Sequence, residues 1–400
     1  YCSCSCSCCC WSMAPLPNGV EKPPIYLDYN GSTPIDAEVC DAMTVMMKEN
    51  WGNPSSSHYF GVQAKKALEA ARRQTADLIG AQPGEITFMS NGTETINHAL
   101  KGLAQVGEKD GRNHIITQAS EHVAVLEVCK ALEKCGCSVS YLPVDSEGLV
   151  SADAVEAAIT SRTICISIMH SNNETGALQP IEEIVARARK APHRIFVHCD
   201  ASQSLGKLPL TVDSLGVDLL TIAGHKLYAP KGVGALYRRC TVPDLPAQIH
   251  GAGQESGRRA STENVIHIVG LGKACEIAKR DLAQTAQHML AMRERLHAQL
   301  LKGLRTRSHL MRCNGPKDNR LPNTLSASFY KVEANTLLSE VSGSVAASAG
   351  AACHSDGVHM SHVLAAMGVS KDWAMGTCRF TVGKGSTAEE MDRAAATLAA

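Results

Sequence analysis

Between about Glu85 and Arg239, short apolar runs alternate with helical stretches, and this alternation constrains the fold more than any other feature of the chain. The runs are rich in β-branched residues and are bounded by polar or turn residues, which is typical of buried strands. Alternating strands and helices predict an α/β fold, in which a mostly parallel, seven-stranded sheet is covered by helices on both faces. The predicted strands are 86–89, 114–117, 139–144, 163–169, 194–199, 217–223 and 234–239.

The chain after residue 280 follows a different pattern. A long helical stretch, 281–304, carries apolar residues on one face, and shorter strands follow at 324–329, 344–349 and 379–382. This pattern predicts a second, smaller α+β domain, against which the early segment 24–34 packs. We therefore divide the chain into three parts: a tract outside the fold at 1–13, a large domain at 32–282, and a small domain formed by 14–31 with 283–400.

Charge and cysteine content narrow the function classes. Lys and Arg together number 39, as do Asp and Glu, so no basic excess favours nucleic acid or an anionic membrane, and we expect neither as a partner. Of the 17 cysteines, 6 fall in the first ten residues, a tract without apolar periodicity, and we expect translation to start at Met13. The remaining cysteines are scattered, which favours a reducing compartment and a cytoplasmic location. A mitochondrial or plastid location stays open because the start is uncertain.

Polar residues gather directly after the apolar runs. In a parallel sheet the carboxyl ends of the strands meet at one edge, where ligands bind. Five runs are followed by candidate chemistry, at 90–94, 120–122, 171–174, 200–203 and 225–226. We expect these residues to form one site.

Each candidate has a chemical and a structural interpretation. Lys226 follows a buried strand, where an amine of lowered pKa can form a Schiff base, although a surface lysine is the simpler alternative. Asp200 fits an ion pair with a protonated pyridine nitrogen, or a helix cap. His122 fits ring stacking or proton transfer, or an ordinary loop histidine. Asn173 and Gln203 fit hydrogen bonds to a ring hydroxyl, or structural roles.

The segment 90–94 opens a predicted helix, so its free N–H groups fit a phosphate, or it is a plain cap. Near the end of the chain, a stretch of small residues from 348 to 357 predicts a flexible loop with an exposed thiol at Cys353. The alternatives for Cys353 are a buried apolar residue, or a zinc site with His354, His359 and His362 whose spacing is unusual. Arg379 fits a substrate carboxylate, or a surface salt bridge.

Taken together, these residues resemble the pyridoxal-phosphate-dependent (PLP) cysteine desulfurase and selenocysteine lyase family, of the aminotransferase-like fold type I. The similarity runs from about Tyr26 to the end of the chain, with order and spacing retained. The matching segments are 26–30, 52–56, 91–94, 120–122, 172–176, 200–203, 224–226, 261–264, 352–353 and 379–380.

The resemblance implies PLP as the cofactor and a role for each matching residue around its ring. Lys226 is the Schiff-base lysine, which also moves the substrate's α-proton. Asp200 partners the pyridine nitrogen, and His122 stacks on the ring. Asn173 and Gln203 lie near the ring hydroxyl, and Asn173 also faces the substrate.

Further roles follow from the same resemblance. Phosphate-binding positions are Gly92, Thr93 and His225. Thr262 reaches the phosphate of a neighbouring subunit, which implies a homodimer with shared active sites. Cys353 takes the chalcogen from a small amino-acid substrate whose carboxylate Arg379 anchors, and a sulfur or selenium acceptor protein receives it. No metal is expected.

Three departures from the family pattern stand out. Ala223 replaces a usual phosphate-contacting serine, which weakens cofactor binding or shifts that contact to Thr93 and Thr262. Lys384 stands where arginine is common, and the chain stops inside its last helix, so we expect the C-terminus to be incomplete.

The residue at 223, with the segments 262–264, 321–324 and 351–356, favours a selenocysteine lyase, which releases alanine from selenocysteine. The alternative is a cysteine desulfurase supplying persulfide for iron–sulfur cluster or thiolation pathways. Two remote alternatives are another fold type I aminotransferase and a catalytically idle scaffold.

Overall fold

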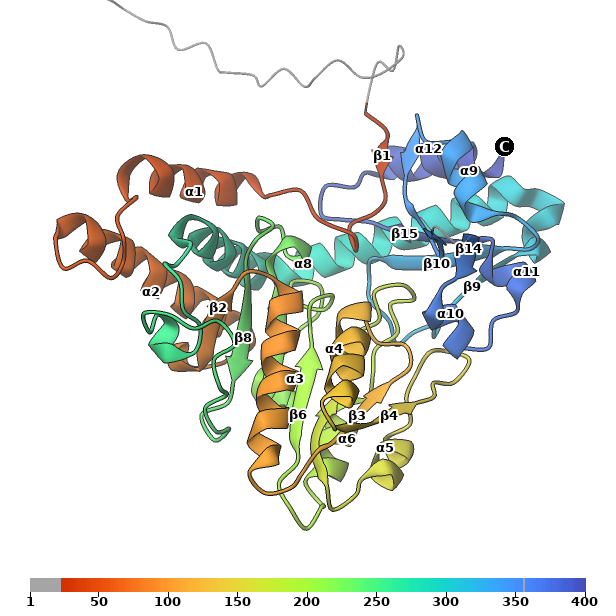
Figure 1. Ribbon diagram of the computed structural model, residues 1–400. Coiled ribbons are helices and arrows are strands. Elements are labelled where there is room, and N and C mark those ends of the chain that lie inside the picture. Colours follow the sequence, from red (N-terminus) through yellow and green to blue (C-terminus); the bar gives the residue numbers. More distant parts are fainter. Residues whose placement is uncertain (1–22, 355–356) are drawn as a thin grey trace, which may run out of the picture.

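The computed structural model of the protein describes residues 23–354 and 357–400, with the side chains of 351–359 left aside. The cysteine tract and Met13 lie outside these residues. Seven strands form the central sheet, in the order β2-β8-β7-β6-β5-β3-β4 (Figure 1). The strands are β2 (Ile86–Met89), β3 (His114–Gln118), β4 (Ser138–Leu142), β5 (Thr163–Ser167), β6 (Phe196–Asp200), β7 (Leu219–Ala223) and β8 (Gly234–Arg238). Pairs from β4 to β7 are parallel, and β8 is antiparallel to both β7 and β2, so the predicted fold class is confirmed.

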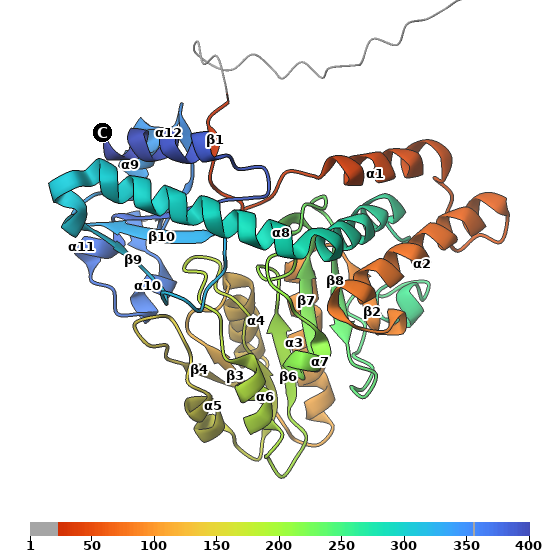
Figure 2. The same ribbon diagram turned by 180° about the vertical axis from the view of Figure 1, so that it is seen from behind.

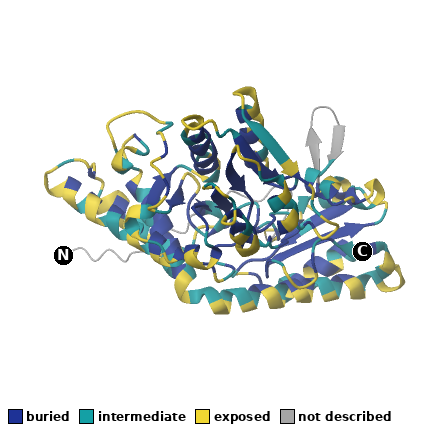
Figure 3. Ribbon diagram, turned by 90° about the horizontal axis from the view of Figure 1, so that it is seen from below, coloured by how far each residue is buried: buried dark blue, intermediate teal, exposed yellow. Residues whose placement is uncertain are grey.

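Helices cover both faces of this sheet because successive strand residues point to opposite sides. In β7, Leu219 packs toward α3 (Gly92–Glu108) and α4 (Val123–Lys134). The next residue, Leu220, packs toward α2 (Tyr59–Ile79), α5 (Ala152–Ala158), α6 (Ile181–Ala188) and α7 (Val212–Leu215). Figure 3 shows the buried residues concentrated in these strands and in the helix faces against them. Pro180 precedes α6 as its N-cap residue.

The helix predicted at 281–304 is longer in the structure. Helix α8 runs from Val265 to Leu304 and packs on α1 (Ala37–Glu49) and α2 with its first half (Figure 2). Small residues make that contact: a Cβ on Gly272 would lie 2.5 Å from the Cα atom of Ala71. Close packing through glycine and alanine leaves little apolar periodicity, which is why the prediction began too late.

The second half of α8 supports a smaller sheet. Its order is β12-β15-β10-β9, formed by β9 (Met311–Cys313), β10 (Thr324–Phe329), β12 (Ser348–Ala349) and β15 (Thr377–Thr381). The single strand predicted at 344–349 is wrong, because β11 (Val345–Ala346) pairs instead with β1 (Ile25–Tyr26) and only β12 joins β15. A separate core here includes Leu27, Leu296 and Phe380. The domain boundary at 282 falls within the continuous helix α8, and the domain division stays a prediction.

The remaining elements complete the smaller layer and its edges. They are α9 (Ala334–Glu340), β13 (Ala351–His354), β14 (Gly357–Met360), α10 (His362–Ala366), α11 (Lys371–Ala374) and α12 (Ala388–Ala399), with short 3₁₀ turns elsewhere. Within the described ranges, no helix combines the length and the apolar character needed to span a bilayer.

Candidate active site

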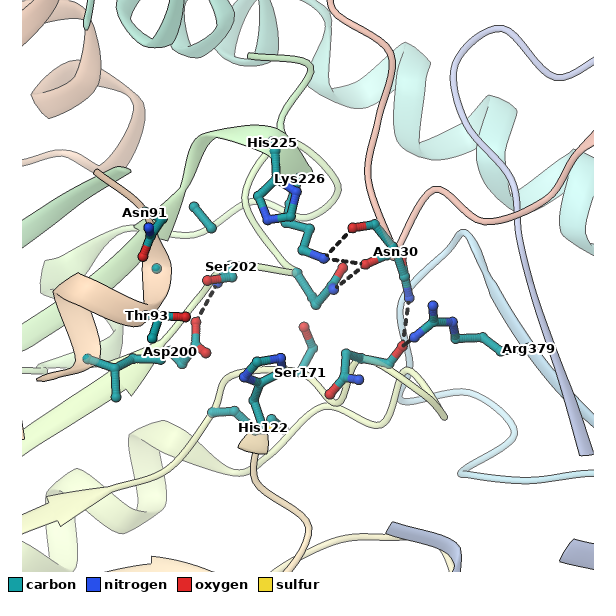
Figure 4. A pocket seen from close by; sticks show the side chains of 17 residues that line it. Asn30, Asn91, Thr93, His122, Ser171, Asp200, Ser202, His225, Lys226 and Arg379 are labelled. Atoms are coloured by element: carbon teal, nitrogen blue, oxygen red, sulfur yellow. Dashed lines mark hydrogen bonds between the residues drawn. The ribbon is translucent and has the colours of Figure 1, made fainter. Parts of the chain in front are cut away.

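A cavity of about 350 Å³ lies at the carboxyl ends of the central strands (Figure 4). It brings together most of the residues that the strand-end argument and the resemblance single out. The predicted residues that line it are Gly92, Thr93, His122, Asn173, Asp200, Gln203, His225, Lys226 and Arg379. Thr262 does not line it, and the Cys353 side chain lies outside the described part of the chain.

Lys226 enters the cavity from a 3₁₀ turn, Gly224–Lys226, that follows β7. Its Nζ donates to the main-chain oxygens of Asn30, at 2.6 Å, and Gly31, at 2.7 Å. Burial, with a further contribution from the Arg379 charge, lowers the pKa of Lys226 to about 8 against the opposing effect of nearby carboxylates. The surface-lysine alternative therefore does not describe this residue, whose amine faces the cavity.

Asp200 is the last residue of β6, which aims its carboxylate at the cavity. One carboxylate oxygen accepts the main-chain N–H of Ser202 at 2.9 Å. The structural and chemical interpretations of Asp200 thus coexist, because a single hydrogen bond leaves acceptor capacity on the carboxylate. A cationic ring nitrogen fits the remaining capacity.

The N-terminus of α3 forms another wall of the cavity. Asn91 caps the helix by accepting the N–H of Glu94 at 2.8 Å, which leaves the N–H groups of Gly92 and Thr93 without an acceptor in the described chain. A Cβ on Gly92 would lie 3.3 Å from the Cβ of Ala223, so glycine keeps this wall open. Free N–H groups at a helix start favour an anion such as phosphate.

Two histidines face the same cavity in different settings. His122 caps α4, with its Nδ1 accepting the N–H of Ala124 at 3.1 Å. Burial lowers the pKa of His122, with the Asp200 charge opposing, and burial lowers the pKa of His225 to about 4. Both rings are therefore predominantly neutral near pH 7, so each can stack or accept a hydrogen bond without adding charge.

Arg379 reaches the cavity from β15 in the smaller sheet. Its guanidinium donates to Asp28 Oδ1 at 2.7 Å, to Ser348 Oγ at 3.1 Å and to the main-chain oxygen of Asn173 at 3.2 Å. The side chain is 13% exposed and its Nε is buried without a partner in the described residues. The surface salt bridge is therefore wrong for Arg379, which is held inside the site with donor capacity left for a carboxylate.

Thr262 lies outside this cavity, and only the backbone of Cys353 is described. Thr262 is exposed and lines a separate hollow with Ser90 and Arg259, so the cavity of its own chain does not use it. The backbone of Cys353 lies in β13 and pairs with Val358 of β14. The predicted loop thus contains a two-stranded hairpin, because β13 and β14 pair with each other; the Cys353 side chain lies outside the described part.

Several residues of the site were missed from the sequence. Asn30 receives Lys226 and Gln203 on its main-chain oxygen, and Ser202 lines the cavity beside Ala223, where it supplies a hydroxyl. Both lie within matching segments, at 26–30 and 200–203, which was the available signal. Lys207 is buried beside the cavity residue Gln203. No sequence signal pointed to it, because a lysine at such a position is ordinarily exposed.

The base of the β13–β14 hairpin is fastened to the loops that carry the site. Ser361 donates its hydroxyl to Glu174 Oε2 at 2.6 Å, and His362 Nε2 donates to the main-chain oxygen of Glu121 at 2.8 Å.

Among side chains that the structure describes, no three His, Cys, Asp or Glu residues are grouped to hold a metal ion.

Comparison with known proteins identifies the family of the chain. The aminotransferase class-V family matches residues 25–394. The chain is 44% identical over 369 residues to the cysteine desulfurase IscS of Dictyoglomus turgidum, covering 92% of each protein. It is 45% identical over 373 residues to the same-named protein of Anaeromyxobacter sp. strain Fw109-5, covering 93% of this chain and 90% of that one.

Solved structures show the same likeness. A NifS-like protein superposes with a TM-score of 0.87 at 38% identity, covering 94% of this chain and 98% of that one. SspA, solved in complex with cysteine, superposes with a TM-score of 0.75 at 34% identity, covering 90% and 99%.

The fold is that of a PLP-dependent enzyme of fold type I. The chain belongs to the aminotransferase class-V family, and within that family it is similar to cysteine desulfurases. Its cofactor is pyridoxal 5′-phosphate. The cavity fits this group: free N–H groups at Gly92 and Thr93 suit the phosphate, Asp200 suits the ring nitrogen, and Lys226 supplies the amine.

Proposed function

We propose that the chain is a cysteine desulfurase, which converts L-cysteine to L-alanine and passes the sulfur onward. The main support for this proposal is that one cavity brings together the Lys226 amine, the Asp200 carboxylate and the N-terminus of α3 beside Arg379. The curated relatives and solved neighbours favour this reading over the selenocysteine lyase that the sequence segments favoured. The latter stays a second candidate, supported by Ala223, which lines the cavity without a hydroxyl.

The chain's own residues supply binding and proton transfer. When bound, pyridoxal phosphate provides an electron sink that stabilises negative charge at the substrate's α-carbon. Arg379 is placed to hold the substrate carboxylate, with Asn173 beside it. Lys226, with its lowered pKa, has a substantial unprotonated fraction near neutral pH, so it can take the α-proton and return it.

The remaining roles concern the cofactor and the sulfur. With pyridoxal phosphate bound, Asp200 would hold the ring nitrogen, His122 would stack on the ring, Gln203 would contact the ring hydroxyl and His225 would support the phosphate. Cys353 receives the sulfur: L-cysteine and the Cys353 thiol give L-alanine and a Cys353 persulfide, with atoms and electrons balanced. The persulfide then passes to an acceptor protein.

We also infer a homodimer with shared sites. Thr262 is exposed and lies outside its own cavity, where a second copy can be reached. Near the start of α2, Trp51 and Tyr59 are 65% and 70% exposed, and Trp51 stacks on the half-exposed Phe60 at 5.1 Å. An apolar surface of this kind is typical of an interface between subunits.

Alanine formation from cysteine and from selenocysteine, measured in parallel, tests the proposal. We expect efficient turnover of cysteine that is lost in Cys353→Ala while the cofactor's visible absorbance remains. Turnover confined to selenocysteine would favour the second candidate. Full activity of Cys353→Ala with an amino-group acceptor would favour an aminotransferase instead. Cys40→Ala, at an exposed cysteine of α1, is the matched control.

A further inference from the structure

Lys207 is a buried lysine that none of the roles above uses. It is 2% exposed and follows Gly206, whose φ of +73° turns the chain back into the interior. A Cβ on Gly206 would lie 2.4 Å from Leu227, so only glycine fits this turn. The backbone is thus built to bring a lysine into the space behind the cavity.

The ammonium of Lys207 contacts neutral oxygens rather than a carboxylate. Its Nζ donates to the main-chain oxygen of Gln203 at 2.9 Å, to Gln203 Oε1 at 3.1 Å and to Asn30 Oδ1 at 3.4 Å. It forms no ion pair within the described residues, and the nearby charges that act on it are those of Lys226 and Arg379. Burial, together with the charges of these two cations, lowers the pKa of Lys207 to about 7. Burying an ammonium group without a carboxylate partner costs free energy, which indicates that the contacts of Lys207 serve a function.

The donors of Lys207 decide how two amides are oriented. An amide side chain has an oxygen and a nitrogen of similar size, so its orientation depends on its neighbours. An ammonium only donates, and it therefore requires the oxygens of Gln203 and Asn30 to face it. With its oxygen turned to Lys207, Gln203 directs its Nε2 to the main-chain oxygen of Asn30 at 3.0 Å. The second hydrogen of that Nε2 has no acceptor in the described chain.

Asn30 is fixed in the same way. Its Oδ1 also accepts from Asn323 at 3.0 Å, and its Nδ2 donates to Thr324 Oγ1 at 2.9 Å. The main-chain oxygen of this residue receives both Gln203 and Lys226. Lys207 therefore contacts both Gln203 and Asn30, and the main-chain oxygen of Asn30 accepts from the Lys226 amine.

We propose that Lys207 is a positioning residue that sets the amide orientations of Gln203 and Asn30. Gln203 then presents an N–H donor, not an oxygen, to the ring hydroxyl of the cofactor, and Asn30 keeps the Lys226 amine in place. The inference rests on the proposed cofactor contact of Gln203, and it does not depend on whether sulfur or selenium is released.

Lys207→Met tests the proposal, because it keeps an apolar stem and removes every donor. In the holoenzyme, we expect the pH midpoint of the cofactor's visible absorbance to shift by at least about half a unit. We also expect the dissociation constant for pyridoxal phosphate to rise about five- to twentyfold, as when one well-made hydrogen bond is lost. Lys190→Met, an exposed lysine after α6, is the matched control and should change neither quantity.

A double-mutant cycle with Gln203→Leu separates positioning from general stability. If Lys207 acts through Gln203, Lys207→Met shifts the midpoint little further once Gln203 is gone. Lys207→Gln, which keeps an N–H donor, should recover part of the wild-type midpoint, and it replaces Lys207→Met if that variant does not fold.

An unchanged midpoint and cofactor affinity, or shifts that add fully in the cycle, would overturn the positioning role even if the melting temperature falls. Absence of the visible band from the wild type would instead overturn the cofactor assignments themselves, so the two failures are distinguishable.

Discussion

The strand-end cavity and the surface around the start of α2 differ in how far their side chains find partners within one chain. In the cavity, Lys226 and Arg379 find their partners within the same chain. At the start of α2, Trp51 and Tyr59 leave most of their surface exposed although apolar groups favour burial. The difference supports our proposal that one chain arranges the chemistry, whereas a second copy covers the α2 surface.

The same contrast separates the two groups of predicted phosphate contacts. Gly92 and Thr93 lie in the cavity of their own chain, at the start of α3. Thr262 lies outside that cavity. The proposed contact of Thr262 with the phosphate in a second copy would tie cofactor retention to assembly, so dilution should then affect the holoenzyme as well as the dimer.

Removing the Lys226 amine should have the largest effect on the strand-end cavity. Lys226→Ala should abolish the cofactor's lysine-linked absorbance and lower alanine formation by about three orders of magnitude, because proton transfer and attachment depend on it. Spectra and steady-state rates measure this. Lys231→Ala, at an exposed lysine nearby, is the control, and comparable activity in the two variants would contradict the role of Lys226.

The lowered pKa of Lys226 sharpens the description of the cavity. The unprotonated amine is the attacking form, so recovery of visible absorbance by apoenzyme mixed with pyridoxal phosphate should quicken about tenfold per pH unit below the pKa. It should level off near pH 8, rather than near the ordinary value of 10.5. Arg379→Met should move this midpoint upward, since the Arg379 charge helps to lower the pKa. A rate that keeps rising to pH 10.5 would show a solvated lysine.

Polar substitutions in the exposed apolar surface around the start of α2 test whether a second copy covers it. Trp51→Ser with Phe60→Ser should weaken dimerisation by about 10- to 100-fold, since burying one large apolar side chain contributes roughly 1.5–3 kcal/mol. Sedimentation across a dilution series measures the dissociation constant. Leu290→Ser, at an exposed apolar residue of α8, is the control. A dimer of unchanged strength would place the interface elsewhere.

Glu121, near the strand-end cavity, should have a smaller effect, on the pH dependence of stability. It is fully buried, its Oε1 accepts from Gln118 and the N–H of Met169, and burial raises its pKa to about 8. Between the ordinary value of 4.5 and about 8, the folded state keeps a proton that the unfolded state loses, so stability falls as pH rises.

Glu121→Gln mimics the protonated acid, so its stability relative to the wild type should increase by about 2–3 kcal/mol between about pH 5 and about pH 7, a window inside this range. Urea unfolding at both ends of the window measures the difference. Glu147→Gln, at an exposed position, is the control, and a pH-independent difference would show that Glu121 is ionised when folded.

Much of the fold was predictable because the central strands carry local signals. Apolar runs bounded by polar residues located all seven strands, and the carboxyl-end rule brought Asp200, His122 and Lys226 to one edge. Helix α8 was found only in part, because Gly270 and Gly272 make its contacts without apolar periodicity. The strand near 345 was misread because its pairing partners, β1 and β15, lie far away in the sequence.

The sequence by itself determined the α/β class, the edge of the sheet that carries the site, and most of the residues at that edge. Local patterns suffice there, because strand direction and residue spacing place those side chains. Only the tertiary structure decided that Arg379 turns inward, that Thr262 lies outside its own cavity, and that Lys207 is buried behind Gln203 and Asn30. Those outcomes depend on contacts between segments far apart in the chain, or on a backbone turn, which no local pattern records.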